Sequence, residues 1–125
     1  MIYGARADAI SGDSIAAGDI HGDGYSDLFI GVPGDAGPLN RPSAGGMAVL
    51  AGGPALPAEI DLANPEVPVV WIEAPDSYDY SAYWGASGDV DGDGPDNMRD
   101  NAGEAHLISG AYLAAYLPGV VTAEP

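Results

Sequence analysis

Residues 16–24 read AAGDIHGDG and residues 86–94 read ASGDVDGDG, so two acidic stretches align without a gap at an offset of 70 positions. A second pair of motifs follows them, SAGGMAVLAG at residues 43–52 and NAGEAHLISG at residues 101–110, at an offset of 58 positions. A repeated order of motifs indicates repeated structural units. We interpret residues 1–55 and 69–125 as two copies of one repeat, the second of them shortened, with a Pro-rich linker at residues 56–68.

Composition favours an all-β fold. Nineteen glycines and eleven prolines in 125 residues break up any long helical period and favour short strands joined by tight turns. Short aliphatic or β-branched runs bounded by turn residues predict strands at 28–32, 47–50, 69–72 and 106–108. Residues 105–117 also fit a helical period in part, so a short helical turn near the C-terminus is the alternative there.

The second copy lacks most of one segment. Between its acidic stretch and its AGG motif the first copy has YSDLFIGVPGDAGPLNRP, whereas the second has only PDNMRD. The strand predicted at 28–32 therefore has no recognisable counterpart. Either the second unit is a strand short or another segment fills that place. The candidates are residues 1–5 and 118–125 of a second copy of the chain.

The acidic stretches have the spacing of calcium loops. Oxygen-bearing side chains at alternate positions around a turn-forming glycine can wrap a cation that takes six to eight oxygen ligands, the seventh position giving its backbone carbonyl. Magnesium suits such a loop less well because it requires strict octahedral geometry. Solvated turns are the alternative reading, since GDG is a common turn sequence. The expected calcium ligands are Asp19, Asp23, Tyr25 and Asp27 in the first loop, and Asp89, Asp91, Asp93, Pro95 and Asn97 in the second.

One position in the first loop departs from this chemistry. His21 stands where an oxygen ligand is expected, and imidazole suits softer ions better than calcium. We interpret His21 as pointing away with a water in its place, the alternative being a preference for a softer ion. We interpret His106 as a core or surface residue of a strand without a chemical role.

The strong negative charge of the chain argues against anionic partners. The formal net charge is −16, with 19 carboxylates against three arginines and no lysine, so nucleic acid and anionic membranes would be repelled. Bound cations that neutralise clustered carboxylates suit such a chain. There is no cysteine, no apolar run of membrane-spanning length and no signal-peptide pattern at residues 1–13. If the protein is secreted, the signal is not in this chain.

Both copies resemble a known repeat family. The segments GDSIAAGDIHGDGYSDLFIGVPG and AGGMAVLAGG resemble an FG-GAP repeat of integrin α-subunits, with its GDxNGDGxxDLxxGAP and AGxxxxxxG motifs. The second copy resembles it in SYDYSAYWGASGDVDGDG and NAGEAHLISG but lacks DLxxGAP. The resemblance implies four-stranded blades of a β-propeller, here two of them, usually extracellular, with calcium in the loop between the first strands. It implies the ligand positions given above, with His21 and Asn97 departing from the family pattern.

Together these features predict a non-catalytic, calcium-binding, extracellular structural or adhesion module that assembles through its blades with copies of itself or with other blades, as a ring or a filament. One alternative is a carbohydrate- or protein-binding fragment of a larger secreted protein, using Trp71, Trp84 and the tyrosines. A glycan-active enzyme using Asp76 and Asp79 is a weaker alternative, because we interpret the neighbouring aromatics as packing between strands and find no nucleophile with a base. Those aromatics are Tyr78, Tyr80, Tyr83 and Trp84.

A dockerin-like module is a further alternative. Asp89, Asp91, Asp93, Asn97 and Asp100 also fit positions one, three, five, nine and twelve of an EF-hand-like loop. That interpretation requires a helix over residues 102–117. The first copy argues against it, since its twelfth position falls inside a predicted strand.

Overall fold

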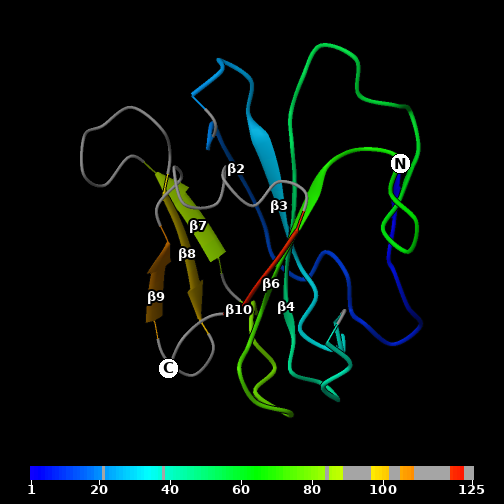
Figure 1. Ribbon diagram of the computed structural model, residues 1–125, viewed down its shortest axis with the longest axis vertical. Coiled ribbons are helices and arrows are strands. Elements are labelled where there is room, and N and C mark those ends of the chain that lie inside the picture. The colour runs from blue at the N-terminus through cyan, green and yellow to red at the C-terminus, as the bar shows by residue number, and fades with distance from the viewer. Residues whose placement is uncertain are drawn as a thin grey trace.

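The computed structural model describes residues 1–20, 22–37, 39–83, 85–88, 97–101, 105–108 and 119–122, and every structural statement below concerns these residues. Their regular secondary structure consists of β-strands alone (Figure 1), which confirms the all-β prediction for this part of the chain. None of the described segments is a helix that could span a membrane. The helical turn considered near the C-terminus would fall mainly on residues 109–118, outside the described ranges.

The first blade is a four-stranded antiparallel meander formed by β2 (Ile15–Gly18), β3 (Asp27–Gly31), β4 (Gly46–Leu50) and β6 (Val69–Glu73). A fifth strand, β10 (Gly119–Thr122), adds to β6 in parallel. The strands predicted at 28–32, 47–50 and 69–72 correspond to β3, β4 and β6, and the strand predicted at 106–108 corresponds to β9 (Ala105–Ile108). Strand β2 was missed because its sequence, IAAG, is short and rich in small residues.

The second blade has three described strands, β7 (Gly85–Gly88), β8 (Asn97–Asn101) and β9 (Ala105–Ile108), which pair antiparallel in that order. Its ladders repeat those of the first blade. β7 pairs with β8 in a register displaced by 70 positions from that of β2 with β3, and β9 is displaced by 58 from β4. The structure thus reproduces both offsets found in the sequence.

The strand that seemed to lack a counterpart has one. β8 occupies in the second blade the place that β3 occupies in the first, although its sequence NMRDN is polar. An antiparallel ladder is made by backbone groups, so a polar segment can form it between two suitable neighbours. The shortening falls instead on the connection after this strand, which spans residues 32–45 in the first blade and 102–104 in the second. Among the four strands of the first meander, β6 is the one without an equivalent in the described part of the second blade.

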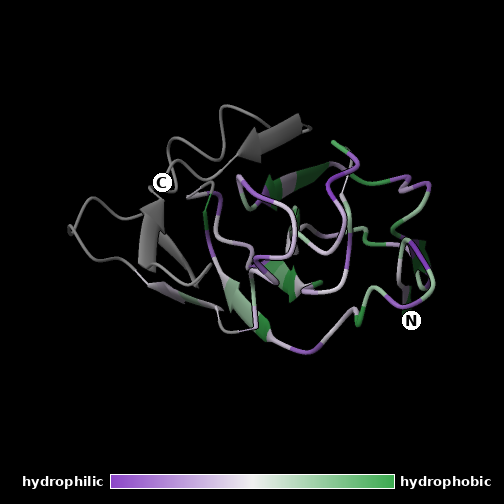
Figure 2. Ribbon diagram, turned by 90° about the horizontal axis from the view of Figure 1, so that it is seen from below, coloured by the Kyte–Doolittle hydropathy of each residue, from purple (hydrophilic) through white to green (hydrophobic). Residues whose placement is uncertain are grey.

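Two apolar layers lie on opposite faces of the first blade, and Figure 2 shows hydrophobic residues on its strands. The alternation along β6 separates them, since Val70 and Ile72 join one layer and Val69 and Trp71 the other. The first layer consists of Ile20, Phe29, Met47, Val49, Val70, Ile72 and Ala82. The second consists of Ile30, Ala48, Leu50, Ile60, Leu62 and Val69.

A short parallel ribbon covers the second layer. It pairs β1 (Ile2–Tyr3) with β5 (Ile60–Asp61), and Ile60 is 6% exposed because it packs on the blade. The segment interpreted as a linker therefore also closes one face of the first blade. Residues 1–5 and 118–125 were candidates to fill the gap in the second blade, but β1 pairs with β5 and β10 pairs with β6 in the same chain.

The segment that leads from the first blade to the second lies along the loop before β4. The amide of Tyr80 donates to the carbonyl of Ser43 at 3.0 Å, and the amide of Ser81 donates to the carbonyl of Ala44 at 2.9 Å. Ser14 Oγ donates to the carbonyl of Ala82 at 2.8 Å. Strand β7 begins three residues later and lies beside β2, to which it is joined by a hydrogen bond from its Ser87 hydroxyl to Ala17.

Two glycines of the first blade make this contact sterically feasible. A Cβ at Gly31 would lie 2.4 Å from the carbonyl oxygen of Ala82, and one at Gly45 would lie 2.5 Å from the nitrogen of Ser81. Gly45 also has a φ of 73°, in the left-handed region. We call the contact of Ser81 and Ala82 with these two glycines the interblade joint.

We expect Gly45→Ala to lower the free energy of unfolding by about 2 kcal/mol or more, because it combines a left-handed backbone with a clash against backbone atoms. Gly53→Ala is the matched control, since a Cβ there meets nothing within 4 Å, and its effect should stay within about 0.5 kcal/mol. Denaturant titration of both variants measures the difference. Equal losses would show that the joint does not depend on a glycine.

Candidate functional site

The first acidic loop is the hairpin connection between β2 and β3. Its base is fixed because Gly18 and Asp27 are paired in the ladder. Asp19 and Asp27, the first and last expected ligands, therefore stand at the two ends of one tight loop. The side chains between them belong to a segment whose ends cannot separate without breaking the sheet.

The loop is wrapped around the carboxylate of Asp19. Its Oδ1 accepts hydrogen bonds from the amides of Gly22 at 2.8 Å and Asp23 at 3.1 Å, and its Oδ2 accepts one from Gly24 at 2.9 Å. Gly22 and Gly24 have φ values of 69° and 89°, which let the amides turn inward. The sequence prediction of a loop that turns at its glycines is consistent with this geometry.

Asp27 is a buried anchor. Its side chain is fully buried, Oδ2 accepts from the amide of Ile20 at 2.8 Å, and Oδ1 accepts from the amide of Gly52 at 2.7 Å. A Cβ at Gly52 would lie 2.1 Å from the carbonyl oxygen of Ser26, so only glycine allows this approach. The carboxylate thus ties the acidic loop to the end of β4, a role that sequence reasoning did not assign to it.

The donor types of the loop fit calcium, but its described residues do not form a preassembled cage. Asp23 is exposed and its Oδ1 accepts from the amide of Tyr25 at 2.9 Å. Among the described residues, no three carboxylate, histidine or cysteine side chains lie close enough to hold a metal ion. His21 lies outside the described residues. A calcium ion in this loop would have to draw Asp19 and Asp23 closer to Asp27, whose position is already fixed.

The second loop occupies the same position in the second blade, because Gly88 pairs with Asn97 as Gly18 pairs with Asp27. Asn97 is the first residue of β8. The other expected ligands of this loop lie outside the described residues: Asp89, Asp91, Asp93 and Pro95.

The helix that the dockerin-like alternative predicts is contradicted by the structure. Residues 105–108 form strand β9, where that interpretation requires a helix over residues 102–117. Asn97 and Asp100, two of its expected ligands, lie in the ladder between β7 and β8. The chain in this region continues as a hairpin and so follows the first copy.

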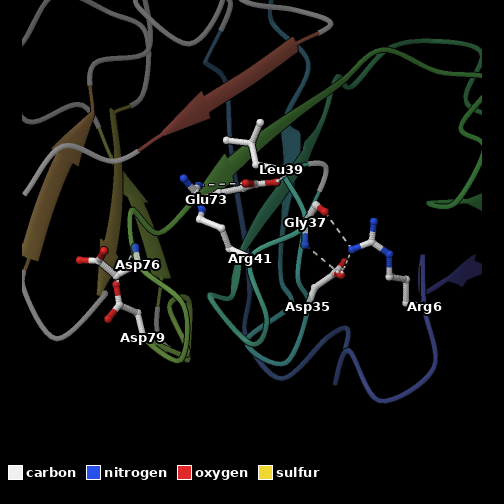
Figure 3. A network of polar contacts seen from close by, with 8 residues as sticks. All are labelled: Arg6, Asp35, Gly37, Leu39, Arg41, Glu73, Asp76 and Asp79. Carbon is white, nitrogen blue, oxygen red and sulfur yellow. Dashed lines mark hydrogen bonds and ion pairs between the residues drawn. The ribbon is translucent and has the colours of Figure 1, made fainter.

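The aromatic segment also differs from its interpretation. Tyr78, Tyr80 and Tyr83 are 67%, 40% and 42% exposed, so they do not pack between strands. The backbone explains this, because Tyr78 and Tyr80 adopt left-handed φ values of 68° and 51° while their amides bond to the loop before β4. Trp84 lies outside the described residues. Asp76 and Asp79 form a local turn in which the amide of Asp76 donates to Asp79 Oδ2 at 3.3 Å (Figure 3).

A polar network that the sequence did not reveal lies beside the first blade (Figure 3). Arg6 Nη1 contacts Asp35 Oδ1 at 2.7 Å, and Arg41 Nη2 contacts Glu73 Oε2 at 3.0 Å. Asp35 and Glu73 are almost completely buried. Two of the three arginines of the chain therefore serve two buried carboxylates. No signal in the sequence pairs residues so far apart.

Glu73 is held in a cramped site. A Cβ at Gly37 would lie 2.0 Å from Glu73 Oε1, so the glycine provides the space that this carboxylate fills. Burial raises the pKa of Glu73 above its ordinary value of 4.5, against the opposing effects of the Leu39 amide and the Arg41 guanidinium. Burial therefore disfavours the ionised form of Glu73, and the hydrogen bond from Leu39 and the charge of Arg41 offset only part of this effect.

Comparison with known protein families finds a match to part of the chain. Residues 11–50 match the family model of the FG-GAP repeat, and this range includes the first acidic loop and β2, β3 and β4. Comparisons with curated proteins and with solved structures found no match. The matched range contains Asp27, which ties the acidic loop to the end of β4. It also contains Gly31 and Gly45, which contact the segment that leads to the second blade.

We expect Asp27→Asn to lower the free energy of unfolding by about 1–3 kcal/mol in the absence of calcium, because asparagine turns one of the two acceptors into a donor that faces an amide. Asp13→Asn, at an exposed position before β2, removes the same charge and should change stability little. Denaturant titrations in chelator provide the measurement. Unchanged stability of Asp27→Asn would mean that this carboxylate acts only as a metal ligand.

Proposed function

Because the chain carries an FG-GAP repeat, a β-propeller repeat, we propose that it is a non-catalytic, calcium-binding structural module of the extracellular space or cell surface, which assembles through its blades. The observation that carries the proposal is the acidic hairpin loop. Its aspartates are held between paired strands, and the same ladder position recurs in the second blade.

Charge supports the calcium part of the proposal. The chain has a net charge of −16 and three basic residues, and Arg6 and Arg41 are committed to Asp35 and Glu73. Carboxylates gathered in a short loop repel one another unless a cation joins them. Calcium accepts the carboxylate and carbonyl oxygens that the loop presents, and extracellular modules bind it with affinities matched to millimolar calcium.

The edges of the blades support the assembly part. β9 is the last strand in the order of the second sheet, with β8 as its partner among the described strands. An unpaired edge of this kind recruits a further strand unless the protein blocks it. The opposite face of the first blade is closed by the β1–β5 ribbon. Strand β10 ends the first sheet in the same way, so we assign assembly to the outer edges of β9 and β10.

Calcium should raise the thermal midpoint of the protein and chelator should lower it, because the ion binds the ordered loop better than the unfolded chain. Asp23→Ala and Asp93→Ala should each weaken calcium binding by about tenfold or more in calorimetric titration, since each removes the central carboxylate of its loop.

Asp13→Ala is the control for calcium binding, because Asp13 is exposed and lies outside both loops. It should leave the affinity within about twofold of the original chain. A thermal midpoint that does not respond to calcium, or equal losses of affinity in all three variants, would point to diffuse attraction of cations and contradict the two sites.

The protein should sediment as an oligomer at micromolar concentration in calcium, because β9 is a terminal strand among the described strands and a second copy can pair with such an edge. Sedimentation velocity across a concentration series gives the mass of the particle. A folded monomer at every concentration would show that this chain does not assemble with itself and would leave other blades as its partners.

A further inference from the structure

A pocket with a volume of about 420 Å³ lies between the N-terminal segment, β6 and residues 60–65, which begin with β5 and which we call the cap of the first blade. This volume is within the range of small-molecule sites. It is lined by Arg6, Asp35 and Trp71 together with small and aliphatic residues of the cap. None of the expected calcium ligands takes part in it.

The charged groups of the pocket are held in place by the fold. Arg6 Nη1 donates to Asp35 Oδ1 at 2.7 Å and to the carbonyl of Gly37 at 2.9 Å, as seen in Figure 3. The Gly37 amide donates to the same Asp35 oxygen at 3.1 Å. The Arg6 side chain is nevertheless 47% exposed, and among the described residues only its Nη1 is engaged. A fixed guanidinium thus presents further donors beside a buried carboxylate.

Trp71 is the third side chain of the pocket that could contact a ligand, beside Arg6 and Asp35. It lies in the middle of β6, is half-buried, and packs against the second apolar layer. Its rigid ring system adds an aromatic surface next to a guanidinium and a carboxylate that neutralise each other. The pocket therefore combines hydrogen-bond donors, an acceptor and an apolar wall without net charge.

Physical chemistry narrows the class of ligand. An anion is disfavoured because Asp35 already neutralises Arg6 and the chain carries a net charge of −16. A cation is disfavoured because the exposed member of the ion pair is the guanidinium of Arg6, whereas the carboxylate of Asp35 is buried. A purely apolar ligand would cover the ion pair without replacing its water. A neutral ring with hydroxyl groups on its rim and an apolar face matches all three walls.

We propose that this pocket binds a neutral hexopyranose, as a monosaccharide or as the end of a glycan. The hydroxyl groups accept hydrogen bonds from the free edge of Arg6 and donate to Asp35, and the C–H face of the ring lies on Trp71. The described lining of this pocket contains no expected calcium ligand, so its test does not depend on the test of calcium binding.

The methyl glycosides of glucose, galactose and mannose are the probes, titrated one at a time into the isotope-labelled protein in calcium. The readout is the indole N–H resonance of Trp71 in proton–nitrogen spectra, identified by its loss in Trp71→Phe. We expect at least one neutral glycoside to shift this resonance in a saturable manner, and glucuronate, the anionic analogue, to bind more weakly than the glucoside.

Two matched variants test the location. Ala63→Phe places a ring at an exposed position in the pocket wall and should weaken the affinity at least tenfold, whereas Ala55→Phe, exposed and outside the pocket, should leave it unchanged. Arg6→Met should also weaken the affinity at least tenfold while the spectrum retains its dispersion. The proposal is overturned if no neutral glycoside shifts the resonance, if glucuronate binds more tightly than the glucoside, or if Ala63→Phe binds as well as Ala55→Phe.

Discussion

The backbone of Ser81 and Ala82 lies against Gly31 and Gly45, two positions of the first blade at which a Cβ would come within 2.6 Å of it. This contact fixes where the chain leaves the first blade and therefore where β7 begins. β7 then lies beside β2, and the hydroxyl of Ser87 bonds to the carbonyl of Ala17 at 2.8 Å. The placement of the three-stranded sheet beside the five-stranded one thus follows from a joint that only small residues permit.

The second copy departs from the first at this joint. Asn101 occupies the position that Gly31 occupies in the first blade, at the same offset of 70. A Cβ at Gly31 would lie 2.2 Å from Ser14 Oγ and 2.4 Å from the carbonyl oxygen of Ala82, so the close approach seen in the first blade requires glycine at this position. The two copies therefore differ in residue type at the ladder position where the first blade receives the connecting segment.

Much of the fold could be predicted from the sequence where burial dictates residue type. The runs in β3, β4 and β6 are aliphatic because both faces of the first blade are covered, and their positions were predicted within one or two residues. β8 could not be predicted, because its polar residues form a strand only between the backbones of β7 and β9. Composition signals burial, whereas ladder pairing also depends on neighbours distant in sequence.

The position of the acidic loop in the chain could be predicted, but the contacts of its side chains could not. Regular spacing located the acidic loop, but it could not distinguish Asp27, which anchors two buried amides, from the exposed Asp23. Nor could it pair Arg6 with Asp35 or Arg41 with Glu73, since those contacts depend on how the cap and the loop before β4 fold onto the blade. Tyr78 and Tyr80 seemed suited to a core, yet their left-handed backbone directs them to solvent.

The interblade joint is tested most directly by amide hydrogen exchange at Ser81, whose amide donates to the carbonyl of Ala44 at 2.9 Å. If the joint holds the second blade against the first, this amide exchanges at least about a hundredfold more slowly than in an unstructured peptide. Gly45→Ala should then remove the protection of Ser81 while the amides of β4 stay protected. In the original chain, exchange of Ser81 at the unstructured rate, while the amides of β4 stay protected, would contradict the joint and the placement of the blades that depends on it.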